Sequence, residues 1–249
     1  MNMKKTILFI LIIAIVGLAS FTAINGMEVG KVKIEKAEDS IDLGLDLAGG
    51  VYVILEAQTD LQGAELQKAM DQTIMVINKR VDGLGVAEPN IVKESNKRIR
   101  IELAGIENPQ EAIDIIGKTA QLQFIDPEGN EVINGKNVKA SEARFQKTEV
   151  GDKPVVTLEF DKEGAKKFAQ STKELAGKIN NEEKIIYIVL DGEVISAPIV
   201  DEPITDGKGV IRGEFTIEEA NSLANLIRAG ALPVEMKALQ SRVIGPTLG

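Results

Sequence analysis

The pattern of hydrophobic and polar positions separates an apolar N-terminal run from a longer mixed region. Residues 6–24 are almost all apolar, which is about the length that a helix needs to cross a bilayer core. Lys4 and Lys5 precede this run, and basic flanks stay on the cytoplasmic side. The pattern predicts a transmembrane anchor over residues 1–26, with a cytoplasmic N-terminus and an extracytoplasmic bulk. Cleavage after Ala19 is the alternative, although the apolar run continues past that residue.

Polar residues at 27–37 predict a stalk, and the pattern then predicts a compact unit. Apolar or alternating segments predict strands at 51–57, 90–94 and 98–103, and the spacing of apolar residues predicts a helix over 61–81. Asn108 and Pro109 suit the first positions of another helix, at 109–117. Strand, helix, strand, strand and helix in this order make up most of a ferredoxin-like α+β unit.

The second half of the chain predicts a further set of elements. Strands are predicted at 121–125, 155–160, 185–190, 194–200 and 210–212, and helices at 163–179 and 216–229. Thr216 and Glu219 form a capping box for the last helix, which Gly230 ends. A final strand follows at 234–243. We expect this helix and strand to complete the first unit, so that the residues between form an inserted α+β lobe.

Composition removes several classes of function. The net charge of −9 argues against nucleic acid as a partner, because phosphate binding requires a basic surface. The chain has no Cys and no His, which excludes disulfides, Cys-ligated metals and Ser-His or Cys-His nucleophiles. We therefore expect neither an enzyme nor a cofactor. An anchored hydrolase that uses two carboxylates is a distant alternative, since no feature selects a pair.

Several short motifs mark places where the backbone is constrained. Gly44, Asp46, Gly49 and Gly50 precede the first predicted strand and indicate a structural turn, since phosphate loops instead follow a strand and open a helix. The octet 43–50 resembles the signature of the SecD family, the accessory subunits of the Sec protein translocase. Five further blocks resemble that family in the same order: 80–89 with Arg80, Gly85, Glu88 and Pro89; 116–124; 189–198 with Asp191, Gly192 and Pro198; 228–233 with Gly230 and Pro233; and 244–249 with Gly245 and Pro246.

This resemblance implies an architecture of base and head. The base would comprise residues 38–118 and 214–249, and the head residues 119–213. The candidate hinges are Lys118, Thr119, Gly213 and Glu214, where the chain passes between the two. The resemblance ends where a second membrane helix would begin, so we expect this chain to be an N-terminal portion without the proton path.

The resemblance also implies a function in the bacterial cell membrane. The head would bind emerging preprotein, an unfolded secretory polypeptide, and with SecF would use the proton motive force to promote completion of translocation. Its partners would be SecF and the SecYEG channel, with YajC as a further candidate. The sequence does not select the head residues that contact preprotein. The alternative function is a membrane-anchored scaffold that docks translocase subunits without contacting substrate.

Overall fold

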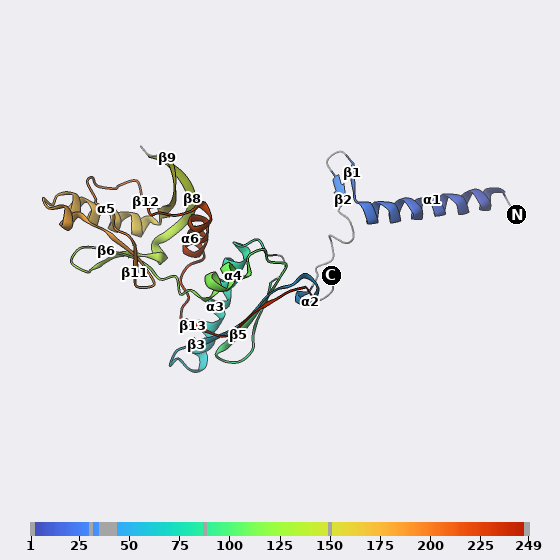
Figure 1. Cartoon of the computed structure of the whole chain (residues 1–249), viewed down its shortest axis with the longest axis horizontal. Coiled ribbons are helices and arrows are strands. Elements are labelled where there is room, and N and C mark those ends of the chain that lie inside the picture. Colours follow the sequence, from blue (N-terminus) through green and yellow to red (C-terminus); the bar gives the residue numbers. More distant parts are fainter. Residues whose placement is uncertain (1–2, 30–31, 35–43, 87–88, 149–150, 247–249) are drawn as a thin grey trace.

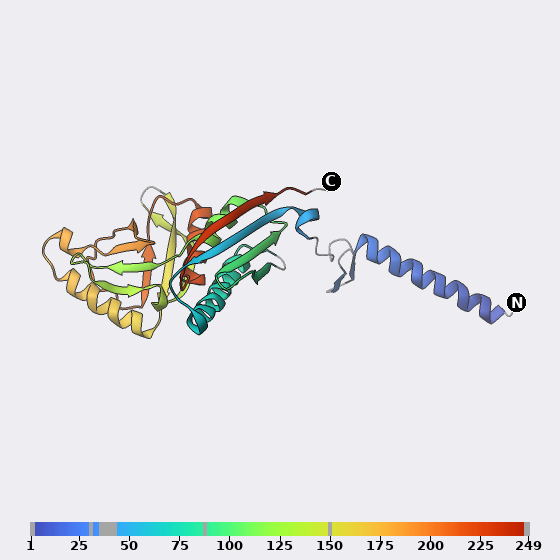
Figure 2. The ribbon, with the colours of Figure 1, turned by 90° about the horizontal axis from the view of Figure 1, so that it is seen from below.

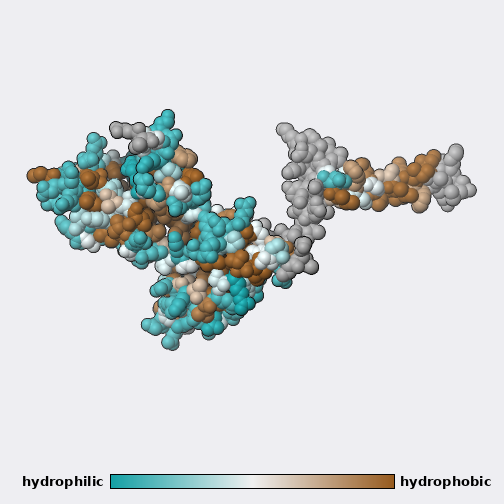
Figure 3. Space-filling view, viewed as in Figure 1, coloured by the Kyte–Doolittle hydropathy of each residue, from teal (hydrophilic) through white to brown (hydrophobic). Residues whose placement is uncertain are grey.

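A computed structural model describes residues 3–29, 32–34, 44–86, 89–148 and 151–246 of the chain. Its first helix, α1 (Met3–Asn25), is long and apolar enough to cross a membrane over Ile7–Asn25. Large hydrophobic side chains from Ile7 to Ile24 dominate the coloured surface of α1, whereas the rest of the coloured surface mixes hydrophobic and hydrophilic residues (Figure 3). Beyond α1, β1 (Met27–Val29) and β2 (Val32–Ile34) form a short antiparallel hairpin in the predicted stalk.

The base is a ferredoxin-like unit, as the sequence predicts. The short helix α2 (Leu45–Ala48) leads into a four-stranded antiparallel sheet in the order β13-β3-β5-β4. The strands and the two connecting helices are β3 (Gly50–Gln58), α3 (Gly63–Asp82), β4 (Asn90–Lys93), β5 (Arg98–Ala104), α4 (Pro109–Gly117) and β13 (Glu235–Ile244). Both helices pack against the same face of the sheet, and α3 runs along that face in Figure 2. This is the βαββαβ order of the ferredoxin-like fold.

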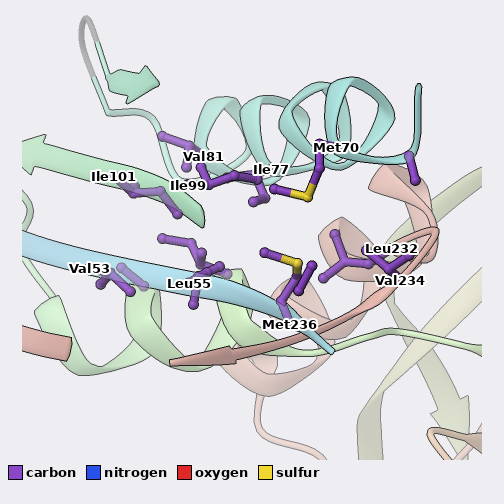
Figure 4. Close-up of a cluster of buried hydrophobic side chains, with 14 of the residues drawn as sticks. Val53, Leu55, Met70, Ile77, Val81, Ile99, Ile101, Leu232, Val234 and Met236 are labelled. Carbon is purple, nitrogen blue, oxygen red and sulfur yellow. The ribbon is translucent and has the colours of Figure 1, made fainter. Parts of the chain in front are cut away.

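The base has its own hydrophobic core between α3 and the sheet (Figure 4). Met70 and Ile77 of α3 face Leu55 of β3 and Ile101 of β5, and all four side chains are fully buried. Leu232, Val234 and Met236 complete this core, although they follow the head in the sequence. The chain has therefore returned to the base by Leu232.

The described residues of the head form two antiparallel sheets, two α-helices and two short 3₁₀ helices, denoted η (Figure 1). One sheet has the strand order β11-β10-β6-β7 and the other the order β12-β9-β8. The elements are β6 (Leu122–Ile125), β7 (Glu131–Asn134), η1 (Gly135–Asn137), β8 (Val138–Thr148), β9 (Gly151–Phe160), α5 (Lys162–Ala176), η2 (Asn181–Lys184), β10 (Tyr187–Leu190), β11 (Glu193–Ser196), β12 (Lys208–Ile211) and α6 (Ile217–Ala229). Phe124, Phe160 and Phe168 lie at the centre of the head core, with ring centroids 4.9–5.8 Å apart.

The position of α6 differs from the prediction that it completes the base. Its Ala220, Ala224 and Ile227 are buried in the same core as Val156 and Leu158 of β9. α3 and α4 already cover one face of the base sheet, and the apolar face of α6 instead packs against β8 and β9 of the head. We therefore count α6 with the head, and of the two predicted elements only the final strand joins the base.

Two strands, β7 and β8, fall where the sequence pattern predicts no element. β8 pairs with β9 from Val138↔Phe160 to Thr148↔Gly151, yet it carries Lys139, Glu142, Arg144 and Lys147. It lies at the edge of its sheet, where charged side chains are tolerated because water covers them.

The local signals for helix starts are confirmed: Asn108 caps α4 and the Thr216–Glu219 capping box starts α6.

Candidate functional site

Two chain segments connect the base to the head, and we call them together the neck (residues 118–121 and 230–232). The outgoing segment follows α4 and leads into β6, while the returning segment links α6 to the base core. The backbone N–H of Leu232 donates to the carbonyl oxygen of Thr119 at 2.9 Å. The outgoing and returning segments are thus joined directly to one another.

The side chain of Arg80, near the end of α3, is fully buried beneath the neck. Its guanidinium donates to the carbonyl oxygens of Ile115 at 2.9 Å and Ile116 at 3.2 Å, at the end of α4. It also donates to the carbonyls of Lys118 and of Thr119 (3.2 Å) in the outgoing segment, and to that of Gly230 (3.1 Å) in the returning segment. One side chain therefore holds α4 and both segments of the neck.

Backbone carbonyls accept the hydrogen bonds that the Arg80 guanidinium donates. The last carbonyls of a helix carry partial negative charge, and Arg80 lies at the C-terminal ends of both α4 and α6. Burial lowers the pKa of Arg80 to about 10, and the charge of Asp191 opposes that shift. Arg80 stays protonated at neutral pH, so a full positive charge is held inside the protein.

Asp191 holds the outgoing segment from the head. It lies in the turn between β10 and β11, where Asp191 (φ 52°) and Gly192 (φ 84°) both have positive φ, as hairpin turns of this kind require. Its carboxylate accepts from the backbone N–H of Ala120 at 3.0 Å and of Gln121 at 2.8 Å. Ala120 also has a positive φ of 61°, so the carboxylate stabilises an unusual backbone conformation.

A cleft of about 1250 Å³ lies beside the neck, between base and head. Its walls combine charged, polar and apolar residues from the base, the neck and the head. The lining residues are Gln72, Gly117, Lys118, Thr119, Gln121, Leu122, Glu131, Asn134, Gly135, Lys136, Asp191, Gly230, Ala231, Leu232, Pro233, Val234, Glu235 and Met236. The described part of the chain holds no cluster of acidic side chains that could bind a metal ion. Polar side chains such as Gln72, Gln121 and Asn134 line the cleft together with the apolar residues Leu232 and Val234.

Comparisons with known proteins agree with this architecture. The family models that match are those of the SecDF P1 head subdomain, over residues 115–234, and the N-terminal part of the P1 domain of protein translocase subunit SecDF, over residues 70–129. The protein translocase subunit SecD of Dictyoglomus turgidum is 47% identical over 207 residues, covering 83% of this chain and 49% of that relative. The chain belongs to the SecD family.

The chain spans about half the length of the curated SecD relatives it matches. Two solved structures share its fold. SecDF in a super-membrane-facing form is 33% identical with a TM-score of 0.70, covering 84% of this chain and 32% of that one. A membrane component SecDF described as enhancing protein export is 29% identical with a TM-score of 0.66, covering 78% of this chain and 100% of that one.

Four of the blocks that resemble SecD meet at the neck. Arg80, Thr119, Asp191 and Gly230 come from four different blocks, and hydrogen bonds or charge link them around the outgoing segment. Gly85 has a positive φ of 73° just after α3, and Pro89 precedes β4. Elsewhere in these blocks, Pro233 lines the cleft. The carbonyl of Pro198 accepts a hydrogen bond from the backbone N–H of Ile186. Glu88 lies outside the described residues.

The remaining two blocks meet at the far end of the base sheet. Gly50 pairs with Ile244, and a β-carbon on Gly49 would lie 2.9 Å from atoms of Ile244 and Pro246. Gly49 and Gly50 have positive φ, as a constrained turn requires. Gly44 does not need to be glycine, since its φ is −62° and no atom lies near its β-carbon position. Asp46 lies in the first turn of α2, and a β-carbon at Gly245 would likewise meet open space.

The structure separates the two pairs of candidate hinge residues. Lys118 and Thr119 lie in the neck, as expected for a crossing point. Gly213 and Glu214 lie inside the head, between β12 and α6, and Glu214 pairs with Lys153 of β9 at 2.8 Å. Because α6 packs with the head, the second crossing moves to residues 230–232.

Sequence reasoning placed Arg80 in a family block and did not identify it as buried. Helical spacing carries the signal: Arg80 follows Ile77 by three residues and Thr73 by seven, and both of these face the core. An arginine on the apolar face of a helix requires buried acceptors. Here carbonyls at the end of α4 and in the neck supply them for the two terminal nitrogens of Arg80, and those carbonyls are remote in sequence.

Proposed function

We propose that this chain works in protein export, as the part of a SecD subunit that handles preprotein outside the membrane. The head holds segments of the emerging unfolded chain, and movement of the head with SecF and the proton motive force promotes completion of translocation. α1 anchors the chain in the bacterial cell membrane with its N-terminus in the cytoplasm, because Lys4 and Lys5 precede the apolar run. Membership of the SecD family supports this assignment.

The cleft beside the neck is the observation that carries the proposal. An unfolded preprotein presents backbone groups and varied side chains, so its binding site must tolerate any sequence. Side chains of both charges at Lys136 and Glu131, with the uncharged polar side chains of Gln72 and Gln121, provide such a surface. Contacts of this kind give weak and reversible binding, which suits a chain that must move on.

The cleft also connects binding to motion. Its walls come from the base, the neck and the head, so any rotation of the head about the neck changes its width. A site that opens and closes with head orientation can grip and release a chain without any reaction. The SecYEG channel and SecF are the partners proposed to deliver the chain and to drive the motion, with YajC as a further candidate.

Photocrosslinking in secreting cells tests this proposal with two matched pairs of probe positions. Gln72 lines the cleft, whereas Lys68, one turn earlier on α3, does not; Lys136 lines it, whereas Lys139 on β8 does not. All four side chains are exposed. We expect a stalled secretory chain to crosslink to positions 72 and 136 more than to 68 and 139. Equal crosslinking at all four positions would reject the cleft as the binding site.

The alternative is a scaffold that docks translocase subunits without holding preprotein. β13 favours it, because this strand forms one edge of the base sheet and exposes Leu239 and Val243. Exposed strand edges recruit other chains by adding a strand to the sheet. Crosslinks from Leu239 to other translocase subunits, with none from the cleft to preprotein, would favour this function over the first.

A further inference from the structure

Two side chains of opposite charge, Arg80 and Asp191, bind neighbouring peptide groups of the outgoing neck segment. The carbonyls of Lys118 and Thr119 point to Arg80, which belongs to the base. The amide groups of the next two residues, Ala120 and Gln121, point to Asp191, which belongs to the head. The partner of the backbone therefore changes from base to head between Thr119 and Ala120.

We propose that Arg80 and Asp191 are positioning residues that together fix the orientation of the head relative to the base. The pivot of the outgoing segment is the link between Thr119 and Ala120. On this assignment Asp191, Ala120 and Gln121 turn with the head, while Arg80 and the carbonyls up to Thr119 stay with the base. The proposal goes beyond the cleft, because orientation is set whether or not preprotein is bound.

Arg80 suits this role because its guanidinium is planar and its donors have fixed directions. It satisfies acceptors from α4, from the outgoing segment and from Gly230 only while these three groups keep their present arrangement. A shift of one group would leave buried polar atoms without partners, which is costly away from water. The result is a discrete preferred orientation instead of a freely flexible linker.

Asp191 acts on the same segment from a more exposed position. Its two carboxylate oxygens each accept one N–H, and these bonds hold Ala120 at a positive φ that alanine seldom adopts. Without them, Ala120 would relax toward negative φ and turn the following strand, β6. Asn225 and Ser222 of α6 also contact the base, at the carbonyl of Gly83 (3.2 Å) and at Glu111, but neither touches the outgoing segment.

The conservative variants Arg80→Lys and Asp191→Asn separate positioning from folding. Lysine keeps the positive charge, but its three donors all start from one nitrogen. It therefore cannot span the separate acceptors that the two terminal nitrogens of Arg80 reach in α4, in the outgoing segment and at Gly230. Asparagine keeps the size and tolerates positive φ, but it offers one acceptor oxygen in place of two. Neither change removes a hydrophobic contact from the base or head core.

Pairs of spin labels measure head orientation in the full-length chain in detergent. The chain has no native cysteine, so labels attach only at introduced ones. Cysteines at the exposed positions Lys68 in the base and Lys173 in the head report on orientation, and a pair at Lys68 and Asn96 within the base is the control. We expect each variant to widen the distribution of the base–head distance at least twofold while leaving the control distribution unchanged.

We call the contacts of Arg80 and Asp191 with the outgoing segment the clamp. Unchanged base–head distance distributions in both folded variants would overturn the proposal. Widening in only one variant would also overturn it, because the clamp requires both residues. If the distance distribution of the control pair widens to the same extent, Arg80 stabilises the fold of the base and does not orient the head. The measurement uses no preprotein. A failure here therefore leaves the cleft proposal standing, and negative crosslinking leaves the clamp standing.

Discussion

A β-carbon on Gly50 would lie 1.9 Å from the carbonyl oxygen of Leu103, on the neighbouring strand β5. The φ of Gly50 is +145°, so the backbone enters β3 in a conformation that side chains seldom allow. Gly50 also pairs with Ile244 on the other side of β3. The first and the last parts of the base are thus joined at a residue that has to be glycine.

Gly50→Ala should lower the free energy of unfolding of the base by about 3 kcal/mol, because it combines a backbone clash with a strained φ. Gly44→Ala is the matched control, since Gly44 has ordinary φ and open space around it. We expect that control to change stability by no more than about 0.5 kcal/mol. Denaturant unfolding measures both, and equal stability of the two variants would contradict this account of Gly50.

Phe168→Ala should destabilise the head by about 3–5 kcal/mol, because it removes a ring from the cluster with Phe124 and Phe160. If head and base have separate cores, amide protection in β6 should fall while protection in β3 persists. Phe145→Ala is the control, since that ring is 62% exposed on β8. Equal loss of protection in both sheets would mean that the cores unfold as one unit.

The ferredoxin-like base could be predicted because local signals and tertiary structure agree there. Helical spacing marks α3, Asn108 marks the start of α4, and alternation in Arg98–Leu103 marks the buried face of β5. Each signal arises within about ten residues of the element that it predicts. The head was harder, since β8 is charged and gains its partners from pairing with β9 and from α6.

The neck could be predicted only in part, because its contacts join residues far apart in sequence. Lys118 and Thr119 were expected at a crossing, and Gly230 was expected to end a helix. Nothing local indicates that α6 packs on the head and not on the base, and this choice moves the second crossing from Gly213 to the residues after α6. Arg80 donates to Gly230 across 150 positions, which no local pattern can reveal.

Thr216→Ala should destabilise the head by about 1 kcal/mol, because the Thr216 hydroxyl accepts from the N–H of Glu219 and caps α6. The Glu219 side chain accepts from the N–H of Thr216 in return, at 2.8 Å. Thr205→Ala, in the exposed loop before β12, is a control that should be close to neutral. Thermal unfolding of both variants checks this, and an equal change in melting temperature would argue against the cap.

The last prediction concerns pH and the turn between β6 and β7. Burial alone would raise the pKa of Asp126, but hydrogen bonds from Asn130 and from the N–H of Glu128 and Gly129 outweigh it and hold that pKa below 3.8. Because the folded-state pKa is the lower one, the carboxylate stabilises the turn fully above pH 3.8, and this contribution is lost as the pH falls through the folded value.

The side-chain amide of Asn130 donates to the Asp126 carboxylate at 3.0 Å. Asn130→Ala removes this donor and leaves the backbone donors in place. The titration midpoint of Asp126, measured by NMR of its carboxyl carbon, should therefore rise toward 3.8 in this variant. Asp201→Asn, at an exposed site elsewhere in the head, should leave that midpoint unchanged. If the midpoint stays the same in Asn130→Ala, the side-chain bond does not stabilise the charged form, and the backbone donors alone account for the low pKa.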